Sequence, residues 1–244
     1  TAVRLEQYGV PQKNIIITGF PLPKENIGSK KEEILKADLG KRLVNLDPKN
    51  EYCSKHKNQI QGSLGKSNYM PKPDHKLTIT YVVGGAGAQK RKGVHITKSL
   101  KNKLMKREII LNLIAGTRKE VKEYFEKEIA SLDLTGFVDI LYFEDKETYF
   151  KEFNQIMRKT DILWTTPSEL SFYTGLGLPI ITTSPLGPQE VYNRQWLEDY
   201  IGSGFREEHF SYLSDWLFYL LNSGRIAEAA REGFLEASKL GTDA

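Results

Sequence analysis

Residues 77–90 read LTITYVVGGAGAQK, an apolar and partly β-branched run that ends in a cluster of glycines before a basic segment. Such a run is typical of a buried strand, and the glycines predict a tight turn into a following helix. Similar runs occur at residues 108–116, 137–143, 161–165 and 178–183, separated by segments with helical spacing. Buried strands that alternate with helices favour a parallel sheet with helices on both faces. The expected fold class is therefore α/β, with a Rossmann-like sheet.

The flanking regions give weaker signals. Residues 14–23, NIIITGFPLP, predict one more strand that ends in a stiff Gly/Pro turn. Residues 36–75 are polar and contain Gly62, Gly65, Pro71 and Pro73, which predicts an irregular insertion or an embellished crossover. Residues 207–240 predict two helices divided near Gly224, with Phe210, Leu213, Leu217 and Leu220 on one stripe.

These signals predict three regions. Residues 1–23 contain the leading strand, residues 24–205 form a Rossmann-like domain with the polar insertion at about residues 36–75, and residues 206–244 form the C-terminal helices. Residues 1–11 resemble the end of a helix running into a turn, and the first residue is not Met, so we expect a fragment of a longer polypeptide.

Composition narrows the class of protein. A chain of 244 residues is long enough to bury a sizeable core, and its single cysteine, Cys53, excludes an intrachain disulfide and indicates a reducing compartment. The sequence contains no apolar run near the roughly 18 residues of a membrane span and no leader of the signal-peptide kind. We expect a soluble, cytoplasmic protein.

The charge pattern leaves two interpretations open. The formal net charge is +4, and residues 90–107 contain eight Lys or Arg residues and no acidic residue. This basic segment is either an ordinary solvated helix face or a surface for phosphate groups or an anionic membrane, which would make the protein membrane-associated. Nucleic acid is not expected as a partner, because the sequence has no zinc pattern and no recognised nucleic-acid-binding motif.

Ligands of open α/β sheets bind beyond the carboxyl ends of the strands. After the strand at residues 77–83 come Gly84, Gly85, Ala86 and Gly87, which would allow the backbone to approach a phosphate. The dinucleotide fingerprint fails, because Lys90 stands where its third glycine is required, and a Walker A loop is absent. The segment is therefore either a generic anion-binding turn or simply a tight turn.

Residues 165–183, TTPSELSFYTGLGLPIITT, carry a helix-start signal directly after a strand. Thr166 is a suitable cap, Pro167 suits the first helical position, and Glu169 completes a T-x-x-E capping box. Glu169 then either reaches back to a backbone amide or accepts hydrogen bonds from both hydroxyls of a sugar diol. Ser168 precedes it at the same strand end.

Residues 184–193, SPLGPQEVYN, follow the next strand and predict a helix that starts at Pro188. Gln189 and Asn193 are four residues apart and would share a helix face, where two amides could address one ligand. Alternatively, these residues form an ordinary polar helix start in which Glu190 complements the helix dipole.

Residues 160–204, TDILWTTPSELSFYTGLGLPIITTSPLGPQEVYNRQWLEDYIGSG, resemble the donor-binding segment of GT-B glycosyltransferases. The similarity is greatest to the bacterial lipid-linked peptidoglycan N-acetylglucosaminyltransferase and the diacylglycerol glycosyltransferases. Residues 9–23 are similar to the interdomain hinge of that family, and residues 82–90 to its first glycine loop. The resemblance covers residues 9–204 with gaps through residues 36–75, and it implies one half of a GT-B fold.

The resemblance also implies a donor site for a nucleotide-sugar, with a uridine diphosphate sugar as the expected donor. Glu169 would hold the ribose hydroxyls, and Ser168 and residues 84–87 would face the diphosphate. The backbone near Tyr142 and Phe143 would meet the base. Around these, Thr166, Gln189, Glu190 and Asn193 complete the expected site, with Gln189 and Glu190 near the sugar hydroxyls. Glu190 replaces a second glutamine of the peptidoglycan enzyme, and WTTP replaces a Gly/Ala-rich approach, which leaves the donor sugar open.

No metal ion and no cofactor is expected, because helix N-termini and amides can stabilise a leaving diphosphate and no D-x-D sequence occurs. In the resembled family the acceptor site and the general base belong to an N-terminal domain, so we expect no catalytic residue here. The isolated chain is predicted to bind the donor but to transfer nothing. The alternatives are a nucleotide-sugar epimerase of the same architecture and a non-catalytic nucleotide- or partner-binding module.

Overall fold

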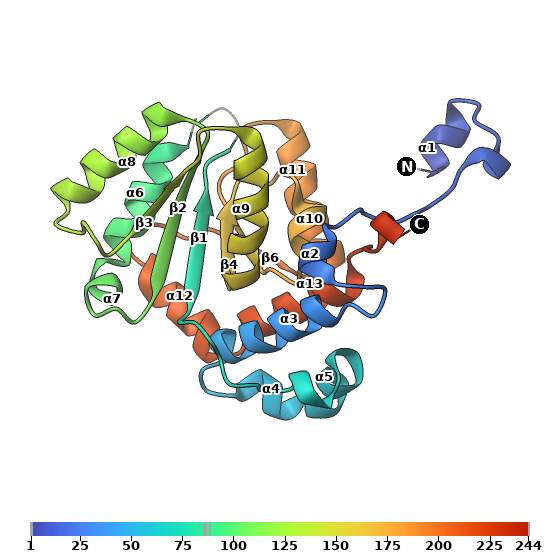
Figure 1. Ribbon diagram of the computed structural model, residues 1–244, viewed down its shortest axis with the longest axis horizontal. Helices are drawn as coiled ribbons and strands as arrows, with labels where there is room; N and C mark the ends of the chain where they lie inside the picture. The colour runs from blue at the N-terminus through green and yellow to red at the C-terminus, as the bar shows by residue number, and fades with distance from the viewer. Residues whose placement is uncertain (1, 85–86, 88, 244) are drawn as a thin grey trace.

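The computed structural model describes residues 2–84, 87 and 89–243, and Figure 1 shows a parallel sheet with helices packed around it. The six strands lie in the order β3-β2-β1-β4-β5-β6, and all neighbouring strands are parallel. They are β1 (Thr78–Val82), β2 (Ile110–Gly116), β3 (Asp139–Tyr142), β4 (Ile162–Thr165), β5 (Ile180–Thr182) and β6 (Gly204–Arg206). This is the strand order of a doubly wound Rossmann-like sheet. The predicted fold class is confirmed.

The helices in the described residues complete the layers. They are α1 (Ala2–Gln7), α2 (Lys24–Ile27), α3 (Glu33–Leu46), α4 (Glu51–Lys55), α5 (Lys57–Leu64), α6 (Lys90–Ser99), α7 (Lys101–Met105), α8 (Lys119–Ser131), α9 (Lys146–Lys159), α10 (Leu170–Gly175), α11 (Pro188–Gln195), α12 (Leu213–Asn222) and α13 (Arg225–Glu236). Short 3-10 turns lie at Gln12–Asn14, Lys66–Asn68 and Gly241–Asp243, and a π-helix at Trp196–Ile201.

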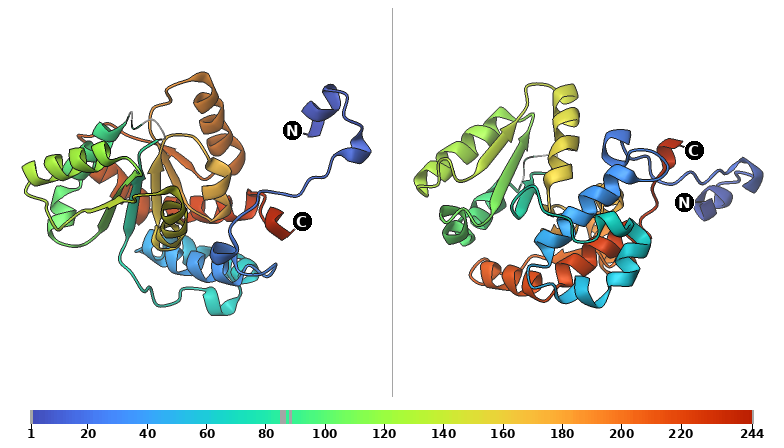
Figure 2. Two further views of the ribbon diagram at one scale, coloured as in Figure 1. Left: turned by 45° about the horizontal axis from the view of Figure 1, so that its top comes forward. Right: turned by 60° about the horizontal axis from the view of Figure 1, so that its bottom comes forward.

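The direction of the crossovers decides which face each helix covers. Connections between parallel strands are right-handed, so the helices between β1, β2 and β3 lie on one face and those of the connections to β4, β5 and β6 on the other. In agreement, α6 packs against α8 and α12, whereas α9 packs against α2 and α3, and α13 against α3 and α10. Figures 1 and 2 show the two groups of helices around the central strands.

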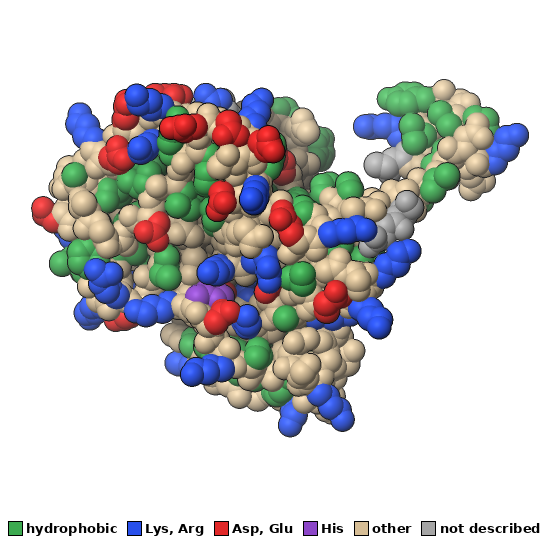
Figure 3. Space-filling view, viewed as in Figure 1, with side chains coloured by type: hydrophobic (Ala, Val, Ile, Leu, Met, Phe, Trp, Pro, Cys, Tyr) green, Lys and Arg blue, Asp and Glu red, His purple; other side chains and the backbone are tan. Residues whose placement is uncertain are grey.

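All five predicted central strands form, and only the short β6 was not predicted. The predicted strand at residues 14–23 is wrong. These residues follow a 3-10 turn as extended chain without a strand partner, and Ile16 and Ile17 are each 82% exposed. A β-branched run has strand propensity, but a strand forms only where another strand can pair with it. Residues 2–18 form an arm that projects from the body in both views of Figure 2, and hydrophobic side chains gather on it in Figure 3.

The predicted irregular insertion at residues 36–75 is largely helical instead. Within α3, Leu35, Leu39, Leu43 and Leu46 recur at helical spacing and are all buried. The turn into α4 is stabilised by the Asp47 carboxylate, which accepts hydrogen bonds from three consecutive backbone amides at 2.7–3.0 Å. The polar residues of this region lie mainly on the solvent-facing sides of its helices.

The C-terminal region forms the two predicted helices, with Gly224 between them at φ +74. The buried stripe of α12 consists of Leu213, Leu217 and Leu221. Phe210 lies before the helix and is only half-buried. Among the helices of the described residues, none combines the length and apolar character needed to cross a membrane.

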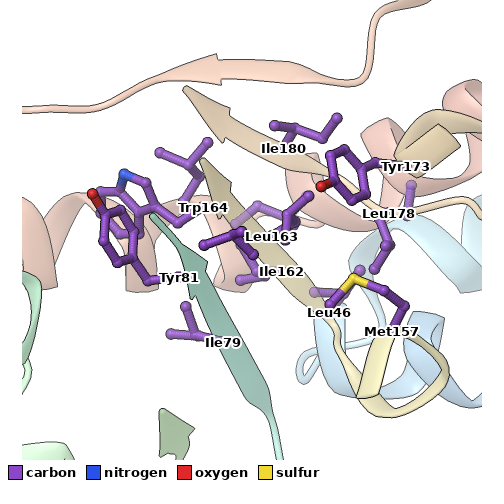
Figure 4. Close-up of a cluster of buried hydrophobic side chains, with 14 of the residues drawn as sticks. Leu46, Ile79, Tyr81, Met157, Ile162, Leu163, Trp164, Tyr173, Leu178 and Ile180 are labelled. Carbon is purple, nitrogen blue, oxygen red and sulfur yellow. The ribbon is translucent and has the colours of Figure 1, made fainter. Parts of the chain in front are cut away.

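The core of the sheet holds large aromatic side chains. Tyr81 of β1 and Trp164 of β4 are paired in the strand register and fully buried, and Figure 4 shows their rings side by side. The Tyr81 hydroxyl donates a hydrogen bond to the carbonyl of Gln89 at 2.7 Å. This bond links the residue before α6 to β1 and so fixes the position of the start of α6 over the sheet.

Two buried charges support the opposite, amino-terminal end of the sheet. The Asp161 carboxylate, just before β4, accepts hydrogen bonds from the Thr78 amide at 2.9 Å and from Asn45 Nδ2 at 3.0 Å. The Arg42 guanidinium of α3 donates to the carbonyls of Thr160 at 2.8 Å and Leu176 at 2.7 Å. Arg42 therefore joins α3 to the ends of α9 and α10, the two helices that border the cleft described next.

Candidate functional site

A cleft of about 1180 Å³ lies beyond the carboxyl ends of β1, β2 and β4. Its strand-end side is lined by residues 82–84 after β1, by residues 115–118 after β2, and by Thr165, Ser168 and Glu169 after β4. Successive strands are added outward from β1 on one side of the sheet and outward from β4 on the other, so the strand order reverses between β1 and β4. Crevices at such switch points are where open α/β sheets bind ligands. The cleft is the candidate functional site.

The other side of the cleft is aromatic. We call the residues Tyr149, Phe150, Phe153, Phe172 and Tyr173, from α9 and α10, the aromatic wall. Neighbouring rings lie 5.3 Å apart for Tyr149 and Phe153, 6.4 Å for Phe153 and Phe172, and 5.3 Å for Phe172 and Tyr173. Because Phe153 and Tyr173 are buried in the core, they hold the more exposed rings in place.

Glu169 lies at the rim of the cleft in an unusual backbone conformation. Its φ is +51° and its ψ is +26°, in the left-handed region that a residue other than glycine rarely adopts. The predicted capping box is wrong: α10 begins at Leu170, and no side chain caps it. The Ser168 amide instead bonds to the Thr166 carbonyl at 2.7 Å, and this tight turn places Glu169 before the helix. The Glu169 side chain is exposed.

The carboxylate of Glu169 is bound to the aromatic wall. The hydroxyl of Tyr173 donates a hydrogen bond to Glu169 Oε2 at 3.4 Å. Burial raises the pKa of Tyr173 well above its usual value, and the negative charge of Glu169 raises it further. Burial, with a contribution from Glu169, also raises the pKa of Tyr149 to about 12. Both phenols therefore remain protonated at neutral pH and can act as hydrogen-bond donors.

Of the predicted glycine turn, the structure describes Gly84 and Gly87, and Gly84 is the one of these two that lines the cleft. Gly84 lines the cleft, and a Cβ atom there would be 3.2 Å from Oγ1 of Thr166. The amide of Gly87 bonds to the carbonyl of Gly84 at 2.8 Å, and Gly87 has a φ of +68° that favours glycine. Gly85 and Ala86 lie outside the described residues. The ends of β1 and β4 thus approach closely here, with Thr166 buried and the Ser168 side chain at the surface of the cleft.

Tyr142 and Phe143 lie at the end of the edge strand β3 and do not line the cleft. The Phe143 amide donates to the Gly116 carbonyl at 3.0 Å, next to the cleft, and its ring lies 5.6 Å from that of Tyr149. Phe143 therefore contacts Tyr149 of the aromatic wall from outside the lining of the cleft.

The three predicted residues of α11 are also outside the lining of the cleft. Glu190 Oε2 accepts a hydrogen bond from the Leu186 amide at 2.8 Å, so this carboxylate closes the turn that starts its own helix. Asn193 Nδ2 donates to the Pro167 carbonyl at 2.9 Å and ties α11 to the loop that precedes Glu169. Gln189 is exposed. The structure therefore places Gly84, Ser168 and Glu169 in the lining of one cleft, and the three α11 residues lie outside that lining.

Sequence reasoning missed several residues of the cleft. Arg118 and Lys146 bring positive charge to its lining, from the loop after β2 and the first turn of α9. Arg118 follows a predicted strand, so the rule that led to residues 84–87 also applied to it. Lys146 and the aromatic wall come from a helix whose position over the sheet the sequence pattern does not specify. Within residues 2–84, 87 and 89–243, no group of three or more His, Cys, Asp or Glu residues is arranged to hold a metal ion.

The basic segment at residues 90–107 is partly used in internal contacts. Lys92 pairs with Glu207, Lys101 Nζ donates to the Leu132 carbonyl at 2.6 Å, and Lys103 pairs with Glu108 at 2.6 Å. Arg91 and Lys98 of α6 are exposed.

Comparisons with known proteins add the following. A family model described as a domain of unknown function (DUF6938) matches residues 119–194, from the start of α8 into α11, a span that includes Glu169 and the aromatic wall. No curated protein matches the sequence. Among solved structures, the chain is similar to a glycosyltransferase from Rickettsia africae ESF-5, with 14% identity and a TM-score of 0.49. The match covers 98% of this chain but 57% of that one, so the chain spans little more than half of that protein's length.

Proposed function

We propose that the protein binds a nucleoside diphosphate sugar of the uridine type in this cleft and forms the donor-binding part of a glycosyltransferase. The observation that carries the proposal is the exposed carboxylate of Glu169, a residue whose backbone is left-handed. Glu169 follows the carboxyl end of β4, next to the point where the strand order reverses. Sheets of this strand order bind nucleotides at that position.

In this proposal Glu169 accepts hydrogen bonds from the two ribose hydroxyls. An ionised carboxylate has acceptors only, and its two oxygens match the spacing of a diol. The left-handed backbone costs about 1–2 kcal/mol in a residue other than glycine, and no capping hydrogen bond from the Glu169 side chain offsets that cost. Strain of this kind is concentrated at ligand-binding positions, where the direction of one side chain matters more than local stability.

The diphosphate would lie between the ends of β1 and β2. The backbone at Gly84 and the hydroxyl of Ser168 offer hydrogen-bonding groups, and Arg118 and Lys146 offer positive charge in the same cleft. Glycosyl transfer breaks the bond between the anomeric carbon and the diphosphate oxygen, which leaves negative charge on the diphosphate. Fixed cations and hydrogen-bond donors aimed at that charge lower the barrier.

The acceptor and the general base are proposed to come from outside these residues. The acidic side chains that line the cleft are Glu120 and Glu169, and Glu120 already lies 3.6 Å from the Arg118 guanidinium. With Glu169 engaged by ribose, we expect the chain by itself to bind a donor without transferring its sugar. Transfer to an added acceptor by the isolated chain would contradict this part of the proposal.

Thermal unfolding with and without uridine diphosphate (UDP) tests the proposal. Ligand at 100 times its dissociation constant stabilises the native state by about 2.7 kcal/mol. We expect this stabilisation in the native chain and its loss in Glu169→Ala. The matched control is Glu32→Ala, since Glu32 also has a left-handed φ, of +58°, directly before a helix but does not line the cleft.

Three other outcomes would point elsewhere. Equal stabilisation of native chain and Glu169→Ala would place the nucleotide away from Glu169. Absence of any nucleotide effect on the native chain would favour a non-catalytic partner-binding module. Conversion of a UDP-sugar to its epimer without an acceptor would favour the epimerase.

A further inference from the structure

The aromatic wall contains an exposed ring that the fold does not need. Every phenylalanine of the sequence lies within the described residues, and Phe150 is the one that is exposed, at 61%. It lines the cleft, and its ring lies 5.3 Å from that of Tyr149. A phenylalanine that is largely exposed gains little from burial in the free protein, and Phe150 lies in the lining of a cleft beside other aromatic rings, which points to a ligand.

The wall reaches the residue proposed to hold the ribose. Tyr173 bonds to Glu169 through its hydroxyl, and its ring lies 6.3 Å from that of Phe153. The Phe153 ring is 5.3 Å from Tyr149, which is next to Phe150. A continuous set of rings therefore leads from Glu169 to the exposed ring of Phe150.

We propose that the aromatic wall stacks against the nucleobase of the bound nucleotide, with Phe150 as the exposed platform, and that the site consequently discriminates little between bases. This inference rests on the proposed function, because it takes the ribose to lie at Glu169. The base is attached directly to the ribose, so a ribose at Glu169 brings the base to these rings. It replaces the expectation that the backbone at Tyr142 and Phe143 meets the base.

The chemistry of the wall explains the low discrimination. Every nucleobase has a π-face, so stacking on an aromatic ring tolerates all of them. Reading one base requires donors and acceptors along its edge, and the side chains of Phe150, Phe153 and Phe172 have neither. The hydroxyl of Tyr173 is already engaged with Glu169. The other hydroxyl of the wall, on Tyr149, can both donate and accept, so it fits a polar atom on the edge of any base.

Binding of UDP and of adenosine diphosphate (ADP) by isothermal titration calorimetry tests the inference. For the native chain we expect dissociation constants within about fivefold of each other. Phe150→Ala should weaken both ligands by about tenfold, as expected for the loss of one stacking contact. Phe150→Leu should show most of the same loss of affinity, because leucine is apolar but has no aromatic ring. Phe150→Tyr should retain native affinity. Circular dichroism should confirm that the variants fold, since the native ring is largely exposed.

A second readout reports stacking directly. In Phe150→Trp, UDP and ADP should both quench the fluorescence of the new indole, relative to the native chain. The matched control is Tyr219→Trp, at an aromatic position on α12 that is 69% exposed and does not line the cleft. No quenching is expected there.

The outcomes separate this inference from the function it rests on. If Phe150→Ala binds UDP normally while Glu169→Ala does not, the inference is wrong and the proposed function stands. If UDP binds the native chain more than a hundredfold tighter than ADP, the base is read by its edge and the stacking mode is wrong. If neither nucleotide binds the native chain, the proposed function fails and the inference fails with it.

Discussion

The Tyr173 hydroxyl lies 3.4 Å from Oε2 of Glu169, one helical turn away on α10, and donates a hydrogen bond to it. The two side chains differ sharply in environment, because Tyr173 is 3% exposed whereas Glu169 is open to solvent. A long acidic side chain at the rim of a cleft is thus held by a ring fixed in the core. The bond joins the packing of the aromatic wall to the direction of the carboxylate that we propose binds ribose.

Removal of this hydroxyl should weaken nucleotide binding more than it weakens the fold. A hydrogen bond contributes about 1 kcal/mol, so Tyr173→Phe should raise the dissociation constant of UDP about fivefold. The ring and its packing remain, and the melting temperature without ligand should change little. In Glu169→Ala, where the acceptor is absent, the additional change Tyr173→Phe should have no further effect on binding. A fivefold effect that persists in that double variant would show that Tyr173 acts by another route.

Glycine in place of Glu169 should separate stability from binding. Glycine adopts the left-handed conformation without steric cost, but it loses more chain entropy on folding and leaves the Tyr173 hydroxyl without its acceptor. Glu169→Gly should therefore stabilise the unliganded protein by at most about 0.5 kcal/mol. The same variant should lose its response to UDP. Urea denaturation with and without ligand measures both effects.

Glu32→Gly is the control for that change. Glu32 has the same backbone conformation, but its carboxylate lies 3.2 Å from Lys36 Nζ, so the gain in stability should be smaller. Its response to UDP should be native. A destabilised Glu169→Gly variant would mean that the carboxylate supports the fold and that the left-handed conformation is not evidence of function.

Much of the sheet could be predicted from the sequence because parallel strands are buried on both faces. That environment demands continuous apolar runs such as Ile162–Thr165, which are visible directly in the sequence. The same signal failed at residues 14–23, because propensity does not reveal whether a pairing partner exists. The leucines of α3 carried a helical spacing, but the polar residues and glycines around them obscured it.

The candidate site could be predicted only where it lies at strand ends. Gly84, Ser168 and Glu169 directly follow strands, and the binding rule for open sheets applies to them from sequence position alone. Phe150 and Lys146 reach the cleft from α9, which depends on how that helix packs over the sheet. The start of α10 was predicted three residues too early, because the capping-box pattern does not exclude a tight turn between Thr166 and Ser168.

Arg42 should be among the most important residues for stability. Its guanidinium is 2% exposed and donates to carbonyls at the ends of α9 and α10, which would lose their partner in Arg42→Met. Unpaired buried carbonyls, together with a buried Asp161 deprived of a nearby positive charge, should cost at least about 3 kcal/mol. The control is Arg206→Met, since Arg206 is 68% exposed in its pair with Glu198 and a solvent-exposed ion pair contributes little to stability. Equal losses in urea denaturation would contradict this assignment.

The pH dependence of stability should depend on His75. Its Nε2 lies 3.2 Å from the buried Asp161 carboxylate and its Nδ1 lies 2.7 Å from Asp74. The hydrogen bond to Asp161, followed by the charges of both carboxylates, raises the pKa of His75 above 6.5, against the opposing effect of burial. A raised folded-state pKa means that the stabilisation is complete below pH 6.5 and is lost as the pH rises through the folded pKa.

We therefore expect the free energy of unfolding to fall as the pH rises above about 6.5 and through the raised pKa of His75, and His75→Asn to flatten that slope. Urea denaturation at intervals across this range measures the slope in both chains. The lowered pKa of Asp74, about 2, keeps that carboxylate charged throughout, so the titration of Asp74 adds nothing to this slope. A native chain that gains stability over this range would contradict the stated direction.

Removal of the N-terminal arm should leave the fold intact, whereas a longer truncation that also removes residues 19–22 should destabilise it. No residue of α1 is buried, and Ile16 and Ile17 are almost fully exposed. Contacts with the body begin at residues 19–22, where the Phe20 carbonyl accepts from the Gly241 amide at 3.1 Å and the Leu22 carbonyl from Thr242 Oγ1 at 2.6 Å. Leu22 is 1% exposed.

A chain that begins at Thr18 should therefore melt within about 2 °C of the native chain, because a stability change below about 0.5 kcal/mol shifts the melting temperature of a domain this size only slightly. A chain that begins at Pro23 should lose about 2–4 kcal/mol, since it lacks the buried Leu22 side chain and the hydrogen bonds to the C-terminal turn. Differential scanning calorimetry of both truncations measures the difference. A large loss already at Thr18 would show that the exposed isoleucines of the arm are covered in solution.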